Sequence, residues 1–413
     1  MNILHKFRQA LPTLFSGFCV VIMVGLIFSP YLLSIGLLGV LIAALLRYFP
    51  AIKSYYKYPS FWTISLLFII TLLGFWSLDD PGFWYERLRI KLPFLLLPIA
   101  FYLKPRLSER QFHGLLYFWV WLLFVSGIGI GIHYFLHQKE IIQLMAQGHP
   151  IPTPRNHIRF SLSIAMGVLS GIYLIWKQYY AWSKVEKKVL IFITLFLFAF
   201  IHFLSVRTGI IALYAALGLI IFSQTLLHKR YVLGTAMVVT LGLLPIFAYQ
   251  FIPSFKAKID YMKWDIQMYL KGEGGNYADA GRMTSLKVGY DIFKEHPLMG
   301  IGPGNLRMAT QKRYAREYPD YVEALTPHNQ FLYTLAGSGL VGGCLFLVAF
   351  IFPFFYKKNY QNPLFLGLYA LLFVSFLLEH SIENSVGVGF CAFFLLLMIN
   401  HLNGRLQWVV GSG

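Results

Sequence analysis

The sequence is short of charged residues. Of its 413 residues only 13% are Asp, Glu, Lys or Arg, whereas 57% are hydrophobic. Soluble globular chains carry about 25% charged residues, so most of this chain cannot face water. The apolar residues also come in long runs, and about 20 such residues are enough to cross a bilayer as a helix. This composition excludes an ordinary soluble protein and predicts an all-α integral membrane protein.

Cysteine is scarce as well. Cys19, Cys344 and Cys391 all lie inside apolar runs, so we expect neither a disulfide nor a zinc site. The chain has no Walker loop, dinucleotide fingerprint, nucleophile elbow or zincin pattern, and these absences leave ATP hydrolysis and redox chemistry unsupported. The net charge of +18 comes largely from Lys and Arg in short tethers between apolar runs. Residues placed in this way orient a membrane protein, so we expect no nucleic-acid partner.

Hydropathy predicts about twelve spans. Their expected limits are 12–29, 31–47, 61–78, 92–103, 112–136, 158–176, 188–204, 208–227, 231–250, 327–355, 364–379 and 386–403. The 92–103 run is short for a crossing. The first run follows Lys6 and Arg8 as in a signal peptide, but it lacks a small-residue cleavage site, so we expect a retained helix. Gly411-Ser412-Gly413 is typical of an expression-tag remnant and is set aside.

The chain therefore divides into spans one to nine (1–250), an outer loop domain (251–326) and spans ten to twelve (327–410). If the N-terminus is cytoplasmic, the short inner loops hold about 17 Lys and Arg, and the short outer loops hold about 7. This bias is what the positive-inside rule requires. It predicts that both termini are cytoplasmic and that the long loop lies on the opposite side of the membrane.

The segment 251–326 differs from the rest of the chain, because it is polar and holds more than half of the acidic residues. Loops of this length are usually functional or disordered, and its aromatic residues argue against disorder. The spacing of Met283, Leu286, Tyr290 and Phe293 predicts an amphipathic helix, which Pro297 would end. Gly300, Gly302 and Gly304 then form a flexible stretch. We expect a small folded domain with amphipathic helices on the outer face.

The clearest candidate for chemistry is Thr326-Pro327-His328-Asn329, where the loop enters the tenth span. Thr326 would be the N-cap and Pro327 the first helical residue. His328 would then lie in the first turn, where the helix dipole disfavours the imidazolium and leaves a neutral ring able to accept a proton. The alternative is a hydrogen-bonded histidine at the membrane interface.

Arginines form a second candidate group. Arg207 lies in a very short outer turn, Arg159 begins a span, and Arg282 opens the amphipathic helix. Arg87 and Arg89 lie in the outer loop before the fourth span. Because a guanidinium binds phosphate oxygens in a bidentate way, converging arginines could hold a pyrophosphate without a metal. The alternative is that these side chains reach out to lipid headgroups, which suits Arg89 best.

Two acidic motifs complete the candidates. Glu379 and Glu383 would share a helix face, and with His380 they could bind a divalent ion, although they are as easily wet interfacial residues. We therefore predict no metal. Asp79-Asp80 is followed by Pro81-Gly82 and is typical of a turn.

Several of these motifs resemble one family. His328-Asn329, followed by nine residues and Gly339-Leu340-Val341-Gly342, resembles the signature of the bacterial O-antigen ligase family. Gly300-Ile301-Gly302-Pro303-Gly304-Asn305 resembles the segment that precedes this signature in the wider O-antigen ligase and polymerase superfamily. Ser205-Val206-Arg207 resembles the Ser-x-Arg turn of that superfamily. The order of the motifs and their positions among the spans fit across the whole chain.

The resemblance implies a GT-C-type glycosyltransferase in the bacterial inner membrane, active at the periplasmic face. It would transfer a glycan from undecaprenyl pyrophosphate to a sugar hydroxyl of lipid A-core, without metal, ATP or other cofactor. His328 would be the general base, with Asn329 orienting it or the acceptor. Arg207, Arg159 and Arg282 would neutralise the departing pyrophosphate, with Arg87 and Arg89 as further candidates. Gly339 and Gly342 would let a neighbouring helix pack closely.

Other functions remain open at this point. An O-antigen polymerase uses the same donor, but polymerases typically have a second large outer loop, and the stretch from His137 to His157 is short. Ligases that glycosylate protein usually carry a larger outer C-terminal portion. A transporter would bury ionisable residues within its spans, whereas they cluster at span ends in this chain.

Overall fold

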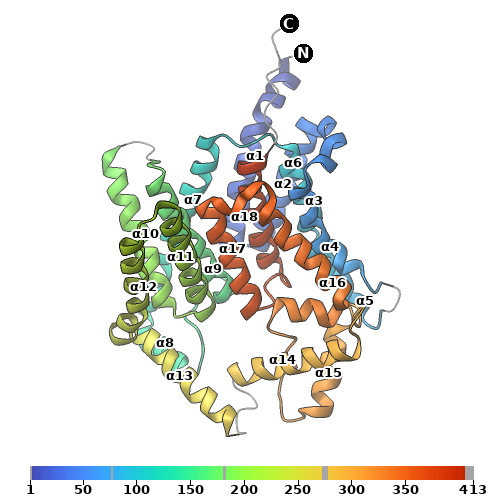
Figure 1. Ribbon diagram of the computed structural model, residues 1–413, viewed down its shortest axis with the longest axis vertical. Coiled ribbons are helices and arrows are strands. Elements are labelled where there is room, and N and C mark those ends of the chain that lie inside the picture. The colour runs from blue at the N-terminus through green and yellow to red at the C-terminus, as the bar shows by residue number, and fades with distance from the viewer. Residues whose placement is uncertain (1, 76–77, 180–182, 272–277, 405–413) are drawn as a thin grey trace.

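A computed structural model describes residues 2–75, 78–179, 183–271 and 278–404. Every regular element in these ranges is a helix (Figure 1). The α-helices are α1 (Asn2–Phe28), α2 (Pro30–Tyr48), α3 (Pro59–Trp62), α4 (Leu66–Ile69), α5 (Pro81–Lys91), α6 (Pro93–Leu103), α7 (Glu109–Leu136), α8 (Gln138–Ala146), α9 (His157–Trp176), α10 (Lys184–Leu204), α11 (Arg207–His228), α12 (Tyr231–Phe251), α13 (Pro253–Leu270), α14 (Ala278–Glu295), α15 (Leu306–Glu317), α16 (Gln330–Phe355), α17 (Pro363–Leu378) and α18 (Ser385–Asn403). Short 3₁₀ segments are η1 (Phe49–Lys57), η2 (Thr63–Ser65), η3 (Ile70–Leu72) and η4 (Tyr356–Gln361).

Eight helices in the described part of the chain are long and apolar enough to cross a membrane. They are Pro30–Lys57, Glu109–Leu136, His157–Trp176, Val185–Leu204, Arg207–His228, Tyr231–Phe251, Gln330–Gln361 and Ser385–Asn403. Three shorter apolar helices are Thr13–Phe28, Pro59–Leu72 and Pro363–Leu378. The expected span at 92–103 is α6, an 11-residue helix with Pro98 inside it. The multi-pass helical architecture is confirmed. Among the described residues, eight helices rather than the twelve expected are both long enough and apolar enough to cross a membrane.

The centre of the bundle is formed by α9 and α18, since 89% of the apolar window in each is buried. Helix α9 packs against α7, α10, α11 and α17, while α18 packs against α6. Phenylalanines join α16 to α17: the Phe331 ring lies 6.0 Å from Phe373, and the Phe350 ring lies 5.3 Å from Phe376. This packing fixes the α17–α18 turn, residues 379–384, which forms part of the candidate site.

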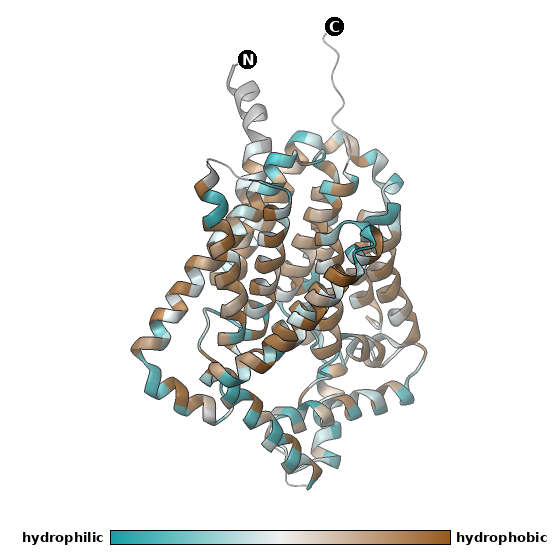
Figure 2. Ribbon diagram, turned by 60° about the vertical axis from the view of Figure 1, so that its left-hand side comes forward, coloured by the Kyte–Doolittle hydropathy of each residue, from teal (hydrophilic) through white to brown (hydrophobic). Residues whose placement is uncertain are grey.

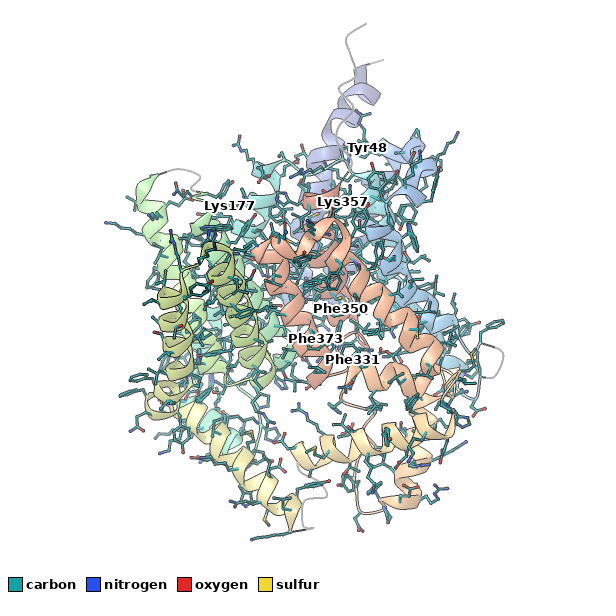
Figure 3. All side chains as sticks on the ribbon, in the orientation of Figure 1. Tyr48, Lys177, Phe331, Phe350, Lys357 and Phe373 are labelled. Carbon is teal, nitrogen blue, oxygen red and sulfur yellow. The ribbon has the colours of Figure 1, made fainter. Side chains whose placement is uncertain are left out.

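The helices of the long loop lie at one end of the molecule. Helices α13, α14 and α15 are opposite the end at which α1 begins (Figure 1), and they carry more hydrophilic residues than the helices above them (Figure 2). Figure 3 places Tyr48, Lys177 and Lys357 near the end where α1 begins. The basic loops predicted as inner loops at Lys177 and Lys357 are therefore at the opposite end of the bundle from the loop helices.

The predicted helix in this loop exists, but its expected buried face was wrong. Helix α14 ends at Glu295, just before Pro297, while Met283 and Tyr290 are 56% and 52% exposed. The buried side instead carries Ser285, Val288 and Ile292. This side packs against α16 around Tyr333 and Ala336, where Val288 and Ile292 belong to the same buried apolar cluster.

The glycines of the two sequence motifs meet in space. A Cβ on Gly300 would lie 2.4 Å from the Gly337 carbonyl carbon, and one on Gly339 would lie 2.3 Å from the Leu298 carbonyl carbon. Gly339 has φ 59° and ψ −161°, so α16 is interrupted there. The freed Leu340 N–H donates to the Pro297 carbonyl at 2.8 Å. Gly339 therefore admits a loop rather than the neighbouring helix that we expected.

The remaining motif glycines also lie at close approaches. Gly302 has φ +89°, and a Cβ on Gly74 would lie 2.7 Å from its Cα. A Cβ on Gly304 would lie 2.9 Å from the Cβ of Trp84, and one on Gly342 would lie 2.2 Å from the Cβ of Ser338. These contacts account for the glycine-rich sequence by packing. The Asp79-Asp80 turn is present too, with Asp80 capping α5 through Phe83 N–H at 3.0 Å.

Candidate active site

His328 lies just before α16 rather than in its first turn. The N-cap is Asn329, whose Oδ1 accepts from the Leu332 N–H at 2.9 Å, so the expectation that Thr326 caps the helix was wrong. The Asn329 side-chain amide also donates to the Leu377 carbonyl at 3.0 Å. Asn329 therefore fixes the start of α16 against the end of α17, and His328 is held at the adjoining position.

Ser285 of α14 holds His328 and sets its tautomer. The Ser285 hydroxyl donates to the Arg282 carbonyl at 2.7 Å, so its single proton is committed. Its oxygen then accepts from the His328 backbone N–H at 3.3 Å and from the ring Nδ1 at 3.4 Å. This contact favours the tautomer with the proton on Nδ1 and the lone pair on Nε2. His328 is thus presented as an imidazole that can accept a proton at Nε2.

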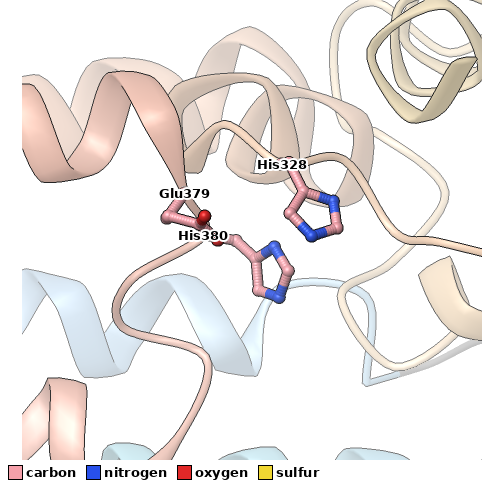
Figure 4. A group of neighbouring side chains, drawn as sticks. All are labelled: His328, Glu379 and His380. Carbon is pink, nitrogen blue, oxygen red and sulfur yellow. The ribbon is translucent and has the colours of Figure 1, made fainter. Parts of the chain in front are cut away.

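His328, Glu379 and His380 form a compact cluster (Figure 4). One ligand-type atom from each lies within 4.8 Å of the others, and the two imidazole rings meet edge to face at 4.9 Å. Burial lowers the pKa of His328; Arg282 and Arg159 lower it further, whereas Glu379 opposes the shift. Burial, with His328 and Arg159 nearby, lowers the pKa of His380 to about 3. Both rings are therefore neutral at neutral pH, by burial rather than by the helix dipole.

The α17–α18 turn is held from several sides. Glu379 and Glu383 do not share a helix face, because Asn384 caps α18 and the residues before it form a turn. Glu383 is buried and accepts from Lys91 Nζ and Gln330 Nε2, both at 2.8 Å. Arg87 donates to the Glu383 carbonyl, and Arg159 donates to the His380 and Ser381 carbonyls, both at 3.4 Å. In this state, two of the five candidate arginines bind backbone carbonyls of the turn.

Arg207 and Arg282 meet at the end of the bundle where the loop helices lie. Arg207 makes a bidentate pair with Asp279, at 2.8 and 2.6 Å. Arg282 Nη1 lies 3.8 Å from the Asp279 Oδ1 atom, and Nη2 donates to Glu379 at 2.8 Å. A continuous line of charge therefore runs from Arg207 through Asp279, Arg282 and Glu379 to the His328 cluster. The sequence left open whether these residues converge, and the structure brings them together.

These arginines line a cavity of about 250 Å³, which we call the basic cavity. Its lining residues are Met145, Gly148, His149, Pro150, His157, Ile158, Leu204, Ser205, Val206, Arg207, Thr208, Lys258 and Arg282. Lys258 donates to the Gly148 carbonyl at 2.7 Å, and burial, followed by Arg207, lowers its pKa. A cavity with three cationic side chains is suited to a polyanion such as pyrophosphate.

Sequence reasoning missed several members of this site. Lys258, Asp279 and Ser285 lie on loop helices whose contacts no local pattern reveals. The amphipathic pattern indicated that the helix at residues 278–295 would pack against another element, but not which element that would be. Arg89, by contrast, is exposed on α5 and forms no ion pair within the described residues. It does not join the group formed by the other four arginines and His328.

The His328, Glu379 and His380 donors are a plausible set for a divalent cation, since imidazole nitrogen and carboxylate oxygen are common ligands. The carboxylate in this set is already paired with Arg282. A cation at this position would therefore compete with the guanidinium for the same carboxylate. The arrangement suits proton transfer at least as well as metal binding.

Residues 190–347 match a family model described as O-antigen ligase. The match supports assignment of the chain to the O-antigen ligase family. Members of this family are membrane enzymes of the glycosyltransferase type, ligases or polymerases. The matched segment runs from α10 to the middle of α16 and contains Arg207, Arg282 and His328.

A relative from Haemophilus influenzae, described as an uncharacterized protein, is 24% identical over 306 residues. The aligned residues cover 72% of this chain and 70% of that protein. The chain is thus similar to a bacterial protein over most of its length. The description of that relative adds no statement of function to the family match.

Proposed function

We propose that this protein is an O-antigen ligase of the bacterial inner membrane. It transfers a glycan from undecaprenyl pyrophosphate to a sugar hydroxyl of lipid A-core, at the periplasmic face and with both termini in the cytoplasm. The supporting observation is that the basic cavity is joined to a neutral histidine through Arg282 and Glu379. This geometry supports an anion-binding site beside a proton acceptor.

The donor pyrophosphate would occupy the basic cavity. Arg207 and Arg282 would bind its oxygens, with Arg159 adding positive charge from behind the α17–α18 turn. Asp279 now occupies the fork of Arg207, so the incoming diphosphate would displace a carboxylate of similar bidentate geometry. Arg87 remains a candidate for the outer part of the donor, although it holds the turn in this structure, whereas the exposed Arg89 lies outside the group.

His328 would act as the general base. The acceptor hydroxyl gives its proton to Nε2 as its oxygen forms a bond to the anomeric carbon of the donor sugar. The bond from that carbon to the pyrophosphate oxygen breaks, and its electron pair leaves with undecaprenyl pyrophosphate. The cations of the basic cavity stabilise this departing charge. Asn329 would keep His328 in place by fixing the start of α16, and no step in this scheme calls for ATP or a metal.

Glycan transfer in proteoliposomes tests the proposal. Purified protein would receive undecaprenyl-pyrophosphate glycan and lipid A-core, with EDTA present, and His328→Ala would be compared with the wild type. We expect ligated lipopolysaccharide from the wild type and a loss of about 10²–10⁴ in rate for the variant.

Other outcomes would revise the proposal. Longer glycans on the donor lipid, without ligation, would identify a polymerase, the other activity within the family. Activity that EDTA abolishes and a divalent cation restores would make the His328 cluster a metal site. Equal rates for His328→Ala and the wild type would remove His328 as the base.

A further inference from the structure

A second feature of the surface lies next to the basic cavity. An apolar groove of about 470 Å³ runs between the outer ends of α7 and α10, and we call it the α7–α10 groove. Its lining residues are Gly127, Ile128, Gly131, Ile132, Phe135, Phe196, Ala199, Phe200, Phe203 and Ile252. All of them are apolar, and both helices are membrane spans. The groove therefore faces the hydrocarbon of the bilayer.

The two walls of the groove differ in shape. On α10, Phe196, Phe200 and Phe203 stack ring on ring, with centroids 5.5 and 5.6 Å apart. On α7, Gly127 and Gly131 lie four residues apart on the facing side: a Cβ on Gly127 would lie 3.0 Å from the Phe196 ring, whereas a Cβ on Gly131 would meet nothing within 4 Å. The groove therefore has an aromatic wall on α10, and on the α7 side it is open at Gly131.

All three segments that bound the groove lead into the basic cavity. On α10, Phe203 lines the groove, and the next residue, Leu204, lines the cavity. On the α12 side, Ile252 lines the groove, and Lys258 of α13 reaches the cavity about 9 Å further along the helix axis. From α7 the chain continues through α8, which packs on α13, to Met145 and Gly148 of the cavity (Figure 1).

We propose that the α7–α10 groove binds the isoprenoid chain of the lipid-linked donor, with the pyrophosphate in the basic cavity beyond it. The inference rests on the proposed function and adds the route by which the donor reaches the site. The site matches both parts of the donor: the apolar groove suits the isoprenoid chain, and it continues into a cavity lined by Arg207, Lys258 and Arg282, which suits the pyrophosphate. A phospholipid of the bilayer has a smaller headgroup charge and no extended branched chain, so we expect it to bind less strongly.

Photo-crosslinking tests where the chain lies, independently of catalysis. Wild-type protein in nanodiscs would be irradiated with a polyprenyl pyrophosphate that carries a diazirine in its isoprenoid chain. We expect labels on peptides that contain residues 127–135 and 196–203, and their removal by excess unlabelled polyprenyl pyrophosphate but not by added phosphatidylglycerol. Equal labelling of all lipid-facing spans, or displacement by phosphatidylglycerol, would show ordinary bilayer lipid and overturn the inference.

Two glycines of α7 offer a matched pair of variants. A Cβ on either Gly129 or Gly131 meets nothing within 4 Å, but only Gly131 lines the groove. Gly131→Phe would fill the groove, and Gly129→Phe would add the same side chain on the same helix outside it. We expect Gly131→Phe to raise the KM for the long-chain donor by about tenfold or more, because buried apolar contact is lost. Gly129→Phe should leave that KM unchanged.

A donor whose lipid chain has only two isoprenoid units distinguishes failure of the groove proposal from failure of the ligase proposal. Both variants should use this short donor at the wild-type rate, because it does not reach along the groove. An unchanged KM for the long donor with Gly131→Phe, in an enzyme that transfers glycan, would overturn the groove while leaving the ligase intact. Specific crosslinking without any glycan transfer would support the lipid site and refute the ligase.

Discussion

Arg282 of α14 donates to Glu379 of the α17–α18 turn at 2.8 Å, and the carboxylate is only 4% exposed. This ion pair joins the loop helices to the membrane bundle at the point where the basic cavity meets the His328 cluster. Glu379 also favours the protonated form of His328, whereas Arg282 opposes it. The pair therefore influences both the position of the proposed anion-binding group, Arg282, and the basicity of the proposed base, His328.

Removing the charge of Glu379 should shift the pH profile of the reaction. Protonated His328 cannot act as a base, so kcat/KM should rise with pH through the His328 pKa, which burial holds below its usual value of 6.5. In Glu379→Gln the imidazolium loses its stabilising carboxylate, so the pKa falls further and the acidic limb moves to lower pH. A kcat/KM profile from pH 4 to 8 measures this shift. A limb that moves to higher pH would contradict the electrostatic role of Glu379.

Arg207 should be irreplaceable by lysine. Its fork makes two hydrogen bonds to the Asp279 carboxylate, a geometry that a diphosphate can also accept. Lysine keeps the charge but offers a single point donor. We expect both Arg207→Lys and Arg207→Ala to lower kcat/KM for the donor by about 10²–10³, as loss of a transition-state donor does elsewhere.

Arg89→Lys is the matched control for this prediction, because Arg89 is exposed and lies outside the group. Its transfer rate should equal that of the wild type. Full activity of Arg207→Lys would mean that charge alone suffices at this position.

Ser285 should act through the tautomer of His328. Its hydroxyl proton is committed to the Arg282 carbonyl, so its oxygen favours the Nδ1–H form of the ring. We expect Ser285→Ala to lower kcat by about tenfold, a fraction of what a positioned base contributes, while the KM for the donor stays the same. Nitrogen chemical shifts of labelled histidine should show less of the Nδ1–H form. Ser285→Thr, which retains the hydroxyl, should recover part of the rate. An unaltered tautomer in Ser285→Ala would refute this role.

Much of this architecture could be predicted from the sequence because it depends on local signals. Long apolar runs identify most spans, and Pro297 marks the end of α14. The order of Arg207, the glycine-rich segment and His328 pointed to the family that the comparison supports. Each of these signals is given by the type and order of residues along the chain and does not depend on which distant residues meet.

The rest depended on partners that are distant in the sequence. The span at 92–103 has the hydropathy of a crossing but only the length of α6. Met283 and Tyr290 suggested the wrong face of α14, because the interface with α16 is made by Ser285 and Val288. Asn329 replaced Thr326 as the cap of α16, since its amide also reaches the Leu377 carbonyl. Lys258 has no motif and belongs to the site only because α13 crosses the end of α10.

Gly339 tests the junction between the loop and the bundle. Its positive φ strains any other residue, and a Cβ would lie 2.3 Å from backbone atoms of Leu298. These atoms belong to a loop held by the Leu340–Pro297 hydrogen bond, so neither side can move without breaking the contact. We expect Gly339→Ala to destabilise the protein by about 1–3 kcal/mol, the usual cost of a strained backbone position.

Gly218→Ala of α11 is the control, because its Cβ meets nothing within 4 Å and alanine is the better helix former. Thermal unfolding in detergent should show a lower Tm for Gly339→Ala and an equal or higher Tm for Gly218→Ala. Since the 297–300 loop connects α14 to α15, we also expect Gly339→Ala to lose transfer activity at temperatures where it remains folded. A variant with wild-type Tm and wild-type rate would show that the loop can retreat from α16, and the glycine motif would then need another explanation.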